Sequence, residues 1–132
     1  MKKVSLILFS CTVVLLMSFM NSNQPKPWPV PEKNKTTANP VKSDAASIAT
    51  GKALYNQHCK SCHGTKGKGD GTKAAQLDTE CGDFTTTAFQ AQTDGAIFYK
   101  TSEGRKDMPS YKKKIPEAND VWAVVNYLRT LK

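Results

Sequence analysis

Five consecutive residues carry the strongest chemical signal in the chain: Cys59, Lys60, Ser61, Cys62 and His63 form a C-x-x-C-H motif. Two thiols at this spacing lie on one helical turn, and each can add to a vinyl group of a haem, which gives two thioether bonds. The histidine that follows then lies under the porphyrin plane, where its imidazole can bind the iron as the proximal ligand. The motif therefore predicts one covalently attached haem c.

Two other interpretations of the cysteine pair stay open at this point. A C-x-x-C pair can be half of a zinc site, but the second ligand pair is missing: Cys11 and Cys81 are single and distant, and His58 adjoins Cys59. A C-x-x-C pair can also be a thioredoxin-like redox dithiol, but no β-α-β pattern surrounds it. We expect Cys81 to be a lone thiol that is buried or half-buried, with a redox or dimer-forming role as the alternative.

A methionine later in the chain has the chemistry of a second iron ligand. Met108 precedes Pro109, and proline biases the residue before it away from the helical region, so Met108 is expected on an extended loop. Its thioether is a soft ligand suited to haem iron. The alternative is that Met108 fills a gap in the core.

The elements that would position these ligands read as helices. Ser43 or Asp44 can cap a helix that runs to His58, with apolar residues recurring at three to four positions from Ile48 onward. Gly51 in the middle of that helix costs about 1 kcal/mol relative to alanine. The glycine therefore indicates that another helix approaches closely.

The residues after the motif are expected to form a flexible loop with four glycines between positions 64 and 71. A phosphate-binding loop is excluded because no Gly-Lys-Ser/Thr triplet and no preceding strand are present. Residues 72–92 show no strong period, although Asp83 could open a short helix that runs through Phe89.

Two more helices are predicted towards the end of the chain. Thr93 or Asp94 can cap a helix over residues 95–101, with Gly104 as its stop. A last helix is predicted over residues 117–131. Its apolar stripe contains Val121, Val124, Val125, Leu128 and Leu131.

Length and charge set limits on the class of protein. The chain of 132 residues holds one domain of about 90 residues plus a leader, and a haem would complete so small a core. The net charge of +8 divides equally between residues 1–40 and 41–132. No Lys/Arg run with interleaved aromatic residues indicates a nucleic-acid groove.

The N-terminal residues predict export. Val4–Met20 contains no charged residue and follows Lys2 and Lys3, so residues 1–20 are a signal peptide or an uncleaved membrane anchor. Lipidation at Cys11 is a third option. The lysines favour a cytoplasmic N-terminus, which places the rest of the chain in the bacterial periplasm or on the outer face of the cytoplasmic membrane.

A proline-rich segment at 21–44 is expected to be a semi-extended linker before a domain at 45–132. Its prolines favour polyproline II and disfavour helix. Trp28 is expected to be either a membrane-interface anchor or a solvated aromatic residue. The prolines are Pro25, Pro27, Pro29, Pro31 and Pro40.

In order and spacing, residues 45–132 resemble a mono-haem class I c-type cytochrome. The resemblance rests on four elements: Gly51 with Tyr55, the haem motif, a Met-Pro-Ser-Tyr segment 45 residues after the motif histidine, and the closing sequence VVNYLRTL at 124–131. It implies an all-α cytochrome c fold, in which about three to five short helices wrap around one covalent haem. It also implies that the first and last helices cross closely at Gly51 and Tyr127.

The same resemblance implies the site and the function. Cys59 and Cys62 would bind the haem covalently, and His63 and Met108 would be the axial ligands of the iron. The protein would then be an electron carrier and not an enzyme, because no open iron site is left for a substrate. If Met108 is not a ligand, a haem enzyme or a gas-sensing domain with an open sixth position is the alternative.

The expected partners are redox proteins with acidic docking surfaces, such as an oxidase, a reductase or a dehydrogenase. Lysines that flank the two ligand loops are candidates for steering these partners, with an ordinary solvated surface as the alternative. They are Lys66, Lys68, Lys112, Lys113 and Lys114.

Overall fold

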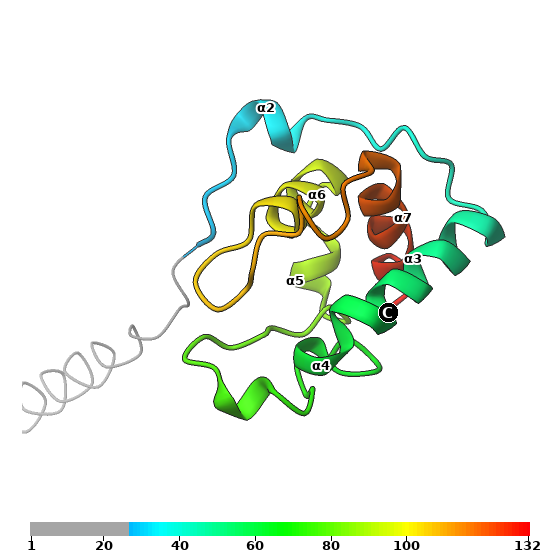
Figure 1. Cartoon of the computed structure of the whole chain (residues 1–132). Coiled ribbons are helices and arrows are strands. Elements are labelled where there is room, and N and C mark those ends of the chain that lie inside the picture. Colours follow the sequence, from blue (N-terminus) through cyan, green and yellow to red (C-terminus); the bar gives the residue numbers. More distant parts are fainter. Residues whose placement is uncertain (1–26) are drawn as a thin grey trace, which may run out of the picture.

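The computed structural model describes residues 27–132, which form helices joined by loops, with no β-strand in that range (Figure 1). The elements are α2 (Glu32–Lys35), α3 (Ala45–His58), α4 (Lys60–His63), a 3₁₀ turn (Ala74–Gln76), α5 (Thr87–Gln90), α6 (Asp94–Glu103) and α7 (Ala118–Leu128). The all-α prediction is confirmed. No helix within these residues is long and apolar enough to span a membrane, and the predicted anchor at 4–20 lies outside them.

Helix α3 begins where the sequence predicted, because Asp44 and Ser47 form a capping box. The Asp44 carboxylate accepts a hydrogen bond from the Ser47 amide at 3.0 Å, and the Ser47 hydroxyl accepts one from the Asp44 amide at 3.2 Å. Two amides that the helix itself leaves unpaired are thereby satisfied.

Helices α3 and α7 cross in close contact at Gly51, as predicted. A Cβ atom on Gly51 would lie 2.0 Å from the carbonyl oxygen of Ala123 and 3.0 Å from the Cβ atom of Tyr127. The rings of Tyr55 and Tyr127 pack at the same crossing with centroids 5.1 Å apart. Because only glycine permits this approach, the crossing fixes α3, and with it the motif at its C-terminal end, against the core.

Helix α7 supplies most of the core. Trp122 stacks on Phe98 of α6 with ring centroids 4.1 Å apart. The helix ends at Leu128, three residues before the predicted end, because the amides of Thr130 and Leu131 bond three residues back in a tightened last turn. The buried residues of α7 are Val121, Trp122, Ala123, Val124, Val125, Asn126, Tyr127 and Leu128.

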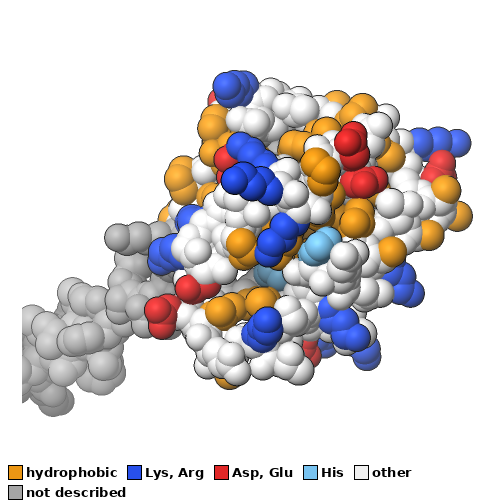
Figure 2. Space-filling model, in the orientation of Figure 1, with side chains coloured by type: hydrophobic (Ala, Val, Ile, Leu, Met, Phe, Trp, Pro, Cys, Tyr) orange, Lys and Arg blue, Asp and Glu red, His pale blue; other side chains and the backbone are white. Residues whose placement is uncertain are grey.

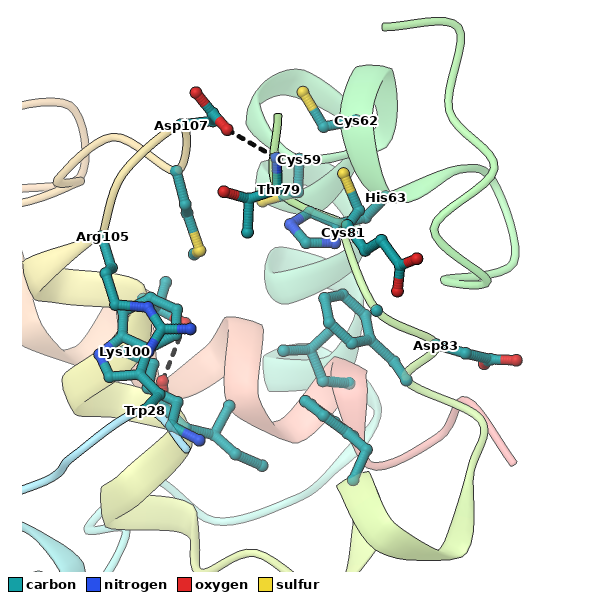
Figure 3. A pocket seen from close by; sticks show the side chains of 18 of the residues that line it. Trp28, Cys59, Cys62, His63, Thr79, Cys81, Asp83, Lys100, Arg105 and Asp107 are labelled. Atoms are coloured by element: carbon teal, nitrogen blue, oxygen red, sulfur yellow. Dashed lines mark hydrogen bonds between the residues drawn. The ribbon is translucent and has the colours of Figure 1, made fainter. Parts of the chain in front are cut away.

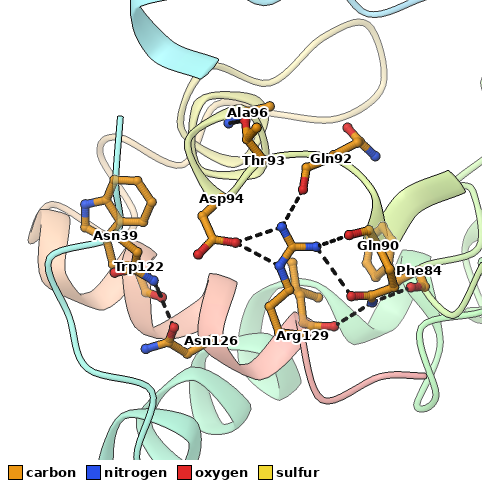
Figure 4. A network of polar contacts seen from close by, with 11 residues as sticks. Asn39, Phe84, Gln90, Gln92, Thr93, Asp94, Ala96, Trp122, Asn126 and Arg129 are labelled. Carbon is orange, nitrogen blue, oxygen red and sulfur yellow. Dashed lines mark hydrogen bonds and ion pairs between the residues drawn. The ribbon is translucent and has the colours of Figure 1, made fainter. Parts of the chain in front are cut away.

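Arg129 ties the C-terminal end of α7 to α5 and α6 (Figure 4). Its guanidinium donates to the Asp94 carboxylate at 2.8 Å and to the Gln90 carbonyl at 2.8 Å. The Gln90 side chain in turn donates to the carbonyls of Phe84 at 2.8 Å and Leu128 at 3.1 Å. This network holds the segment around Phe84 at a fixed distance from α7.

The short helix expected to open at Asp83 begins instead at Thr87, so its predicted start is wrong. The Asp83 carboxylate accepts from the amide and the hydroxyl of Thr85, each at 2.7 Å, which forms a local turn. Thr86 then caps α5 by accepting from the amide of Phe89. Helix α6, by contrast, has the predicted Thr93 cap and Gly104 stop.

Residues 27–44 do not form the extended linker that the prolines predicted. We call this segment the N-terminal strap, because it packs along the domain (Figure 1). Its helix α2 lies against α6, where a Cβ atom on Gly95 would lie 2.0 Å from the Asn34 carbonyl oxygen. Pro31 occupies the cap position before α2, where its ring blocks no helical hydrogen bond.

The strap is also held to α7. The Asn39 amide donates to the Asn126 side chain at 2.8 Å, and Asn126 donates to the Val41 carbonyl at 3.2 Å. A buried asparagine that exchanges hydrogen bonds with the strap would be left unsatisfied if the strap separated. Residues 27–44 therefore belong to the folded body.

Candidate haem site

The motif residues lie on one turn at the junction of α3 and α4. Cys59 is the cap residue directly after α3, and its carbonyl accepts from the amides of Cys62 at 3.1 Å and His63 at 2.9 Å. Cys59, Cys62 and His63 all line one cavity (Figure 3). The cysteines are free, and burial raises the pKa of Cys59 to about 12, so its thiol enters the cavity uncharged.

The glycine-rich loop after the motif folds back onto it. The amides of Gly69 and Gly71 donate to the carbonyls of His63 at 2.9 Å and Cys62 at 3.1 Å, and the Tyr55 hydroxyl donates to the Gly64 carbonyl at 2.7 Å. A Cβ atom on Gly71 would lie 2.4 Å from the Ser61 carbonyl oxygen. The predicted loop is present, and its glycines allow the backbone to approach the motif closely.

The His63 ring lies at the wall of this cavity. Its Nδ1 atom is buried and has no hydrogen-bond partner among residues 27–132, and its ring stacks on Phe84 with centroids 4.5 Å apart. Burial lowers the pKa of His63, which favours the neutral imidazole that binds metals. A neutral imidazole on the cavity wall beside two free thiols has the chemistry of an iron ligand.

The cavity has the size and lining of a cofactor site. Its volume is about 450 Å³, within the range of pockets that bury organic cofactors. Its surface is mostly apolar, and Figure 2 shows hydrophobic and histidine side chains inside a hollow on this face. The apolar residues of its walls include Leu77, Phe84, Ala88, Phe89, Ile97 and Leu128.

Met108 lines the same cavity from a tight turn, in agreement with its predicted loop position. Arg105 and Met108 exchange backbone hydrogen bonds of 2.8 and 3.0 Å, and Lys106 between them has a left-handed φ of 54°. The Tyr111 hydroxyl donates to the His58 carbonyl at 2.8 Å, which ties this loop to the end of α3. The fold thus brings His63 and Met108 together from segments far apart in the sequence.

Cys81 also lines the cavity and is half-buried. Burial, the nearby Cys62 and Asp107 raise the pKa of its thiol. Residues 27–132 contain no group of three or more His, Cys, Asp or Glu side chains that could hold a metal ion. The zinc interpretation therefore has no ligand set in this part of the chain.

Sequence reasoning missed several lining residues. Phe84 and Phe89 come from the segment without periodicity, and their rings pack 4.6 Å apart. Trp28, Lys100 and Arg105 line the cavity as well. The one available signal was the tryptophan itself, an isolated aromatic residue in a polar, proline-rich segment.

A covalent haem motif inside an apolar cavity of an all-α domain defines the class of c-type cytochromes. The family described as "Cytochrome C oxidase, cbb3-type, subunit III" matches residues 46–128, and the chain belongs to that family. It is a mono-haem c-type cytochrome, and the family binds haem c covalently. The free thiols, the half-buried imidazole and the apolar cavity described above fit that group.

Solved structures agree with this assignment. The "KustC0563 c-type cytochrome" is 31% identical with a TM-score of 0.53, and the match covers 62% of this chain and 96% of that one. The Kuenenia stuttgartiensis reducing HAO-like protein complex Kustc0457/Kustc0458 contains a similar fold, at 24% identity and a TM-score of 0.64. That match covers 80% of this chain and 52% of the other, so our chain spans about half of that relative. No curated protein matches the chain.

Proposed function

We propose that the protein is a one-electron carrier in which His63 and Met108 are the axial ligands of the haem iron. The observation that carries the proposal is that a loop-held methionine and the half-buried imidazole of the motif histidine line one cavity. When bound, the haem supplies an iron that cycles between Fe(II) and Fe(III). The thioether of Met108 would favour Fe(II), and the neutral imidazole of His63 would hold the iron from the motif.

The surrounding residues support fast electron exchange. The cavity walls are mostly apolar, and the Met108 loop is tied to the end of α3 by the hydrogen bond from the Tyr111 hydroxyl to the His58 carbonyl. The loop after the motif is tied to the motif by hydrogen bonds from the Gly69 and Gly71 amides. An environment held in this way would limit the reorganisation that accompanies each electron transfer. With both His63 and Met108 bound to the iron, no position would be open to a substrate.

We infer further that the partners are redox proteins with acidic docking surfaces in the bacterial periplasm or at the outer face of the cytoplasmic membrane. Lys66, Lys68 and Lys113 are exposed. Lys112 pairs with Glu103 at 2.6 Å, and the Lys114 ammonium lies 5.5 Å from the centre of the Tyr111 ring. The family description names an oxidase subunit, and an oxidase is one partner of the expected chemistry.

The experiment that tests the proposal is Met108→Ala. We expect the oxidised variant to lose the weak sulfur-to-iron charge-transfer band, its reduction potential to fall, and carbon monoxide to bind quickly to the reduced form. Lys106→Ala and Lys112→Ala are the controls, since these lysines are the nearest competing ligands in sequence, and both are exposed. Each should keep the band.

A parent protein that binds carbon monoxide readily would overturn the proposal. It would instead support the alternative of a haem enzyme or gas-sensing domain with an open sixth position. A Met108→Ala protein that keeps the band and stays closed to small ligands would also overturn it, because another residue would then be the ligand.

A further inference from the structure

Two cations and a tryptophan form a cluster on the wall of the haem cavity. The Arg105 guanidinium lies 4.6 Å from the centre of the Trp28 ring, and the Lys100 ammonium lies 5.8 Å from it. Arg105 also donates to the Pro27 carbonyl at 3.3 Å, and Lys100 donates to the Gln92 side chain. All three clustered side chains line the cavity, and we call them the cationic cluster.

Neither cation of the cluster has a carboxylate partner among residues 27–132. The ion pairs found there involve the other cations Lys35, Lys112 and Arg129. Asp107 lines the same cavity, but its carboxylate accepts from the Thr79 amide at 2.9 Å. Burial and the neighbouring Arg105 lower the pKa of Lys100. Two adjacent, partly buried positive charges are unfavourable unless an anion lies between them.

The position of the cluster indicates which anion this is. Figure 3 shows Trp28, Lys100 and Arg105 at one end of the cavity and Cys59 and Cys62 at the other. A haem carries its two vinyl groups on one edge of the porphyrin and its two propionates on the opposite edge. If the thiols fix the vinyl edge, the propionate carboxylates would extend away from the cysteines, towards the cluster.

We propose that Arg105 and Lys100 bind the haem propionates and that Trp28 of the N-terminal strap holds the Arg105 guanidinium in place. The indole presents its face to the guanidinium, which is a favourable cation–π geometry. Trp28 lies outside residues 46–128, the region matched by the family. The haem site is thus completed by a segment beyond the shared domain, docked through Asn39 and α2.

The proposal predicts how the protein sets its potential. Cations that neutralise the propionates favour the reduced iron, which carries one positive charge less than the oxidised iron. By Coulomb's law, removing a unit charge about 10 Å from the iron at an effective dielectric constant of about 20 changes the redox equilibrium roughly tenfold. For one electron, tenfold corresponds to about 59 mV.

The experiment uses the holoprotein and four variants: Arg105→Gln, Lys100→Gln, Trp28→Phe and the control Lys113→Gln. Lys113 is exposed, so the control removes one positive charge without touching the cavity. Redox titrations from pH 5 to pH 9 give the potential of each protein. Resonance Raman spectra of the propionate bending modes report directly on hydrogen bonds to the carboxylates.

We expect a potential that is nearly independent of pH in the parent and in the control. In Arg105→Gln and Lys100→Gln, a propionate without its cation has a raised pKa, and its deprotonation adds a negative charge. The potential should therefore fall as the pH rises through that pKa, and the bending modes should shift. Trp28→Phe keeps the stacked ring, so it should shift the modes less than Arg105→Gln.

The proposal is overturned if Arg105→Gln and Lys100→Gln lower the potential only as much as Lys113→Gln at every pH, with unchanged propionate modes. The cluster would then act through its general field alone. The inference rests on the covalent haem and not on the sixth ligand. The sulfur-to-iron band of the parent reports Met108 separately, so the two proposals can fail independently.

Discussion

Replacing Gly51 by alanine should destabilise the protein, although alanine is the better helix former. The new Cβ atom would lie 2.0 Å from the Ala123 carbonyl oxygen, which is 1.4 Å short of an ordinary contact at 3.4 Å. The carbonyl belongs to the backbone of α7 and cannot swing aside, so the two helices must separate. Overpacking of this kind costs up to about 3 kcal/mol. The gain in helix propensity offsets about 1 kcal/mol of it.

The expected net loss is about 2 kcal/mol, which corresponds to a fall of about 8–16 °C in Tm for a domain of this size. Guanidinium titration of the oxidised holoprotein, followed by far-ultraviolet circular dichroism, measures the loss. Lys52→Ala is the matched control, because Lys52 is the next residue of α3 and is exposed. Its effect should stay within about 0.5 kcal/mol. A Gly51→Ala protein as stable as the control would refute the close crossing.

Two further predictions concern the covalent attachment of the haem and the processing of the N-terminus. Acid denaturation and extraction with organic solvent should leave the haem on the protein, because two thioether bonds hold it. The double variant Cys59→Ala/Cys62→Ala should yield colourless and largely unfolded protein. Colour in the organic phase of the parent protein would contradict the thioether bonds. Mass spectrometry of the native N-terminus should find residues 4–20 retained as an anchor; a mature start between residues 19 and 30 would show a cleaved leader instead.

Much of the fold could be predicted because its signals are local. Asp44 begins α3 through a capping box within one turn, and Thr93 and Gly104 mark the ends of α6. A mid-helix glycine indicates a close helix crossing, and Gly51 lies at one. The helix ends were predicted from residues within a few positions of each end. The crossing was predicted from Gly51 alone, because a glycine destabilises a helix and is best explained by a second helix packed closely against it.

The predictions that failed depended on contacts that the local sequence pattern does not indicate. Asp83 resembles a helix cap in sequence, but it forms a turn with Thr85, and the next residue, Phe84, accepts a hydrogen bond from the Gln90 side chain of α5. The strap is rich in proline, and its composition cannot reveal that Asn39 finds Asn126, which is 87 residues away. Composition describes what a segment prefers alone, and tertiary hydrogen bonds outweighed that preference here.

The residues of the site also differ in whether the sequence alone predicts them. The attachment motif is five consecutive residues, so the sequence alone predicted it. The wall formed by Phe84 and Phe89 could not be predicted, because these residues share no periodic pattern and meet the cavity only through the loop that carries them. Met108 lies between these cases: Pro109 predicts its loop, but its presence in the cavity with His63 is a property of the fold.

If the cationic cluster binds the propionates, the residues that attach the haem and the residues that set its reduction potential lie on different parts of the chain. The attachment chemistry lies on α3 and α4, within the region shared with the family. Trp28, by contrast, is held by the strap, whose contacts with α6 and α7 involve neither cysteine. A change in the strap can therefore alter the charge around the propionates while the thioether bonds stay the same. The electrostatic control of the iron is then separable from the attachment of the haem.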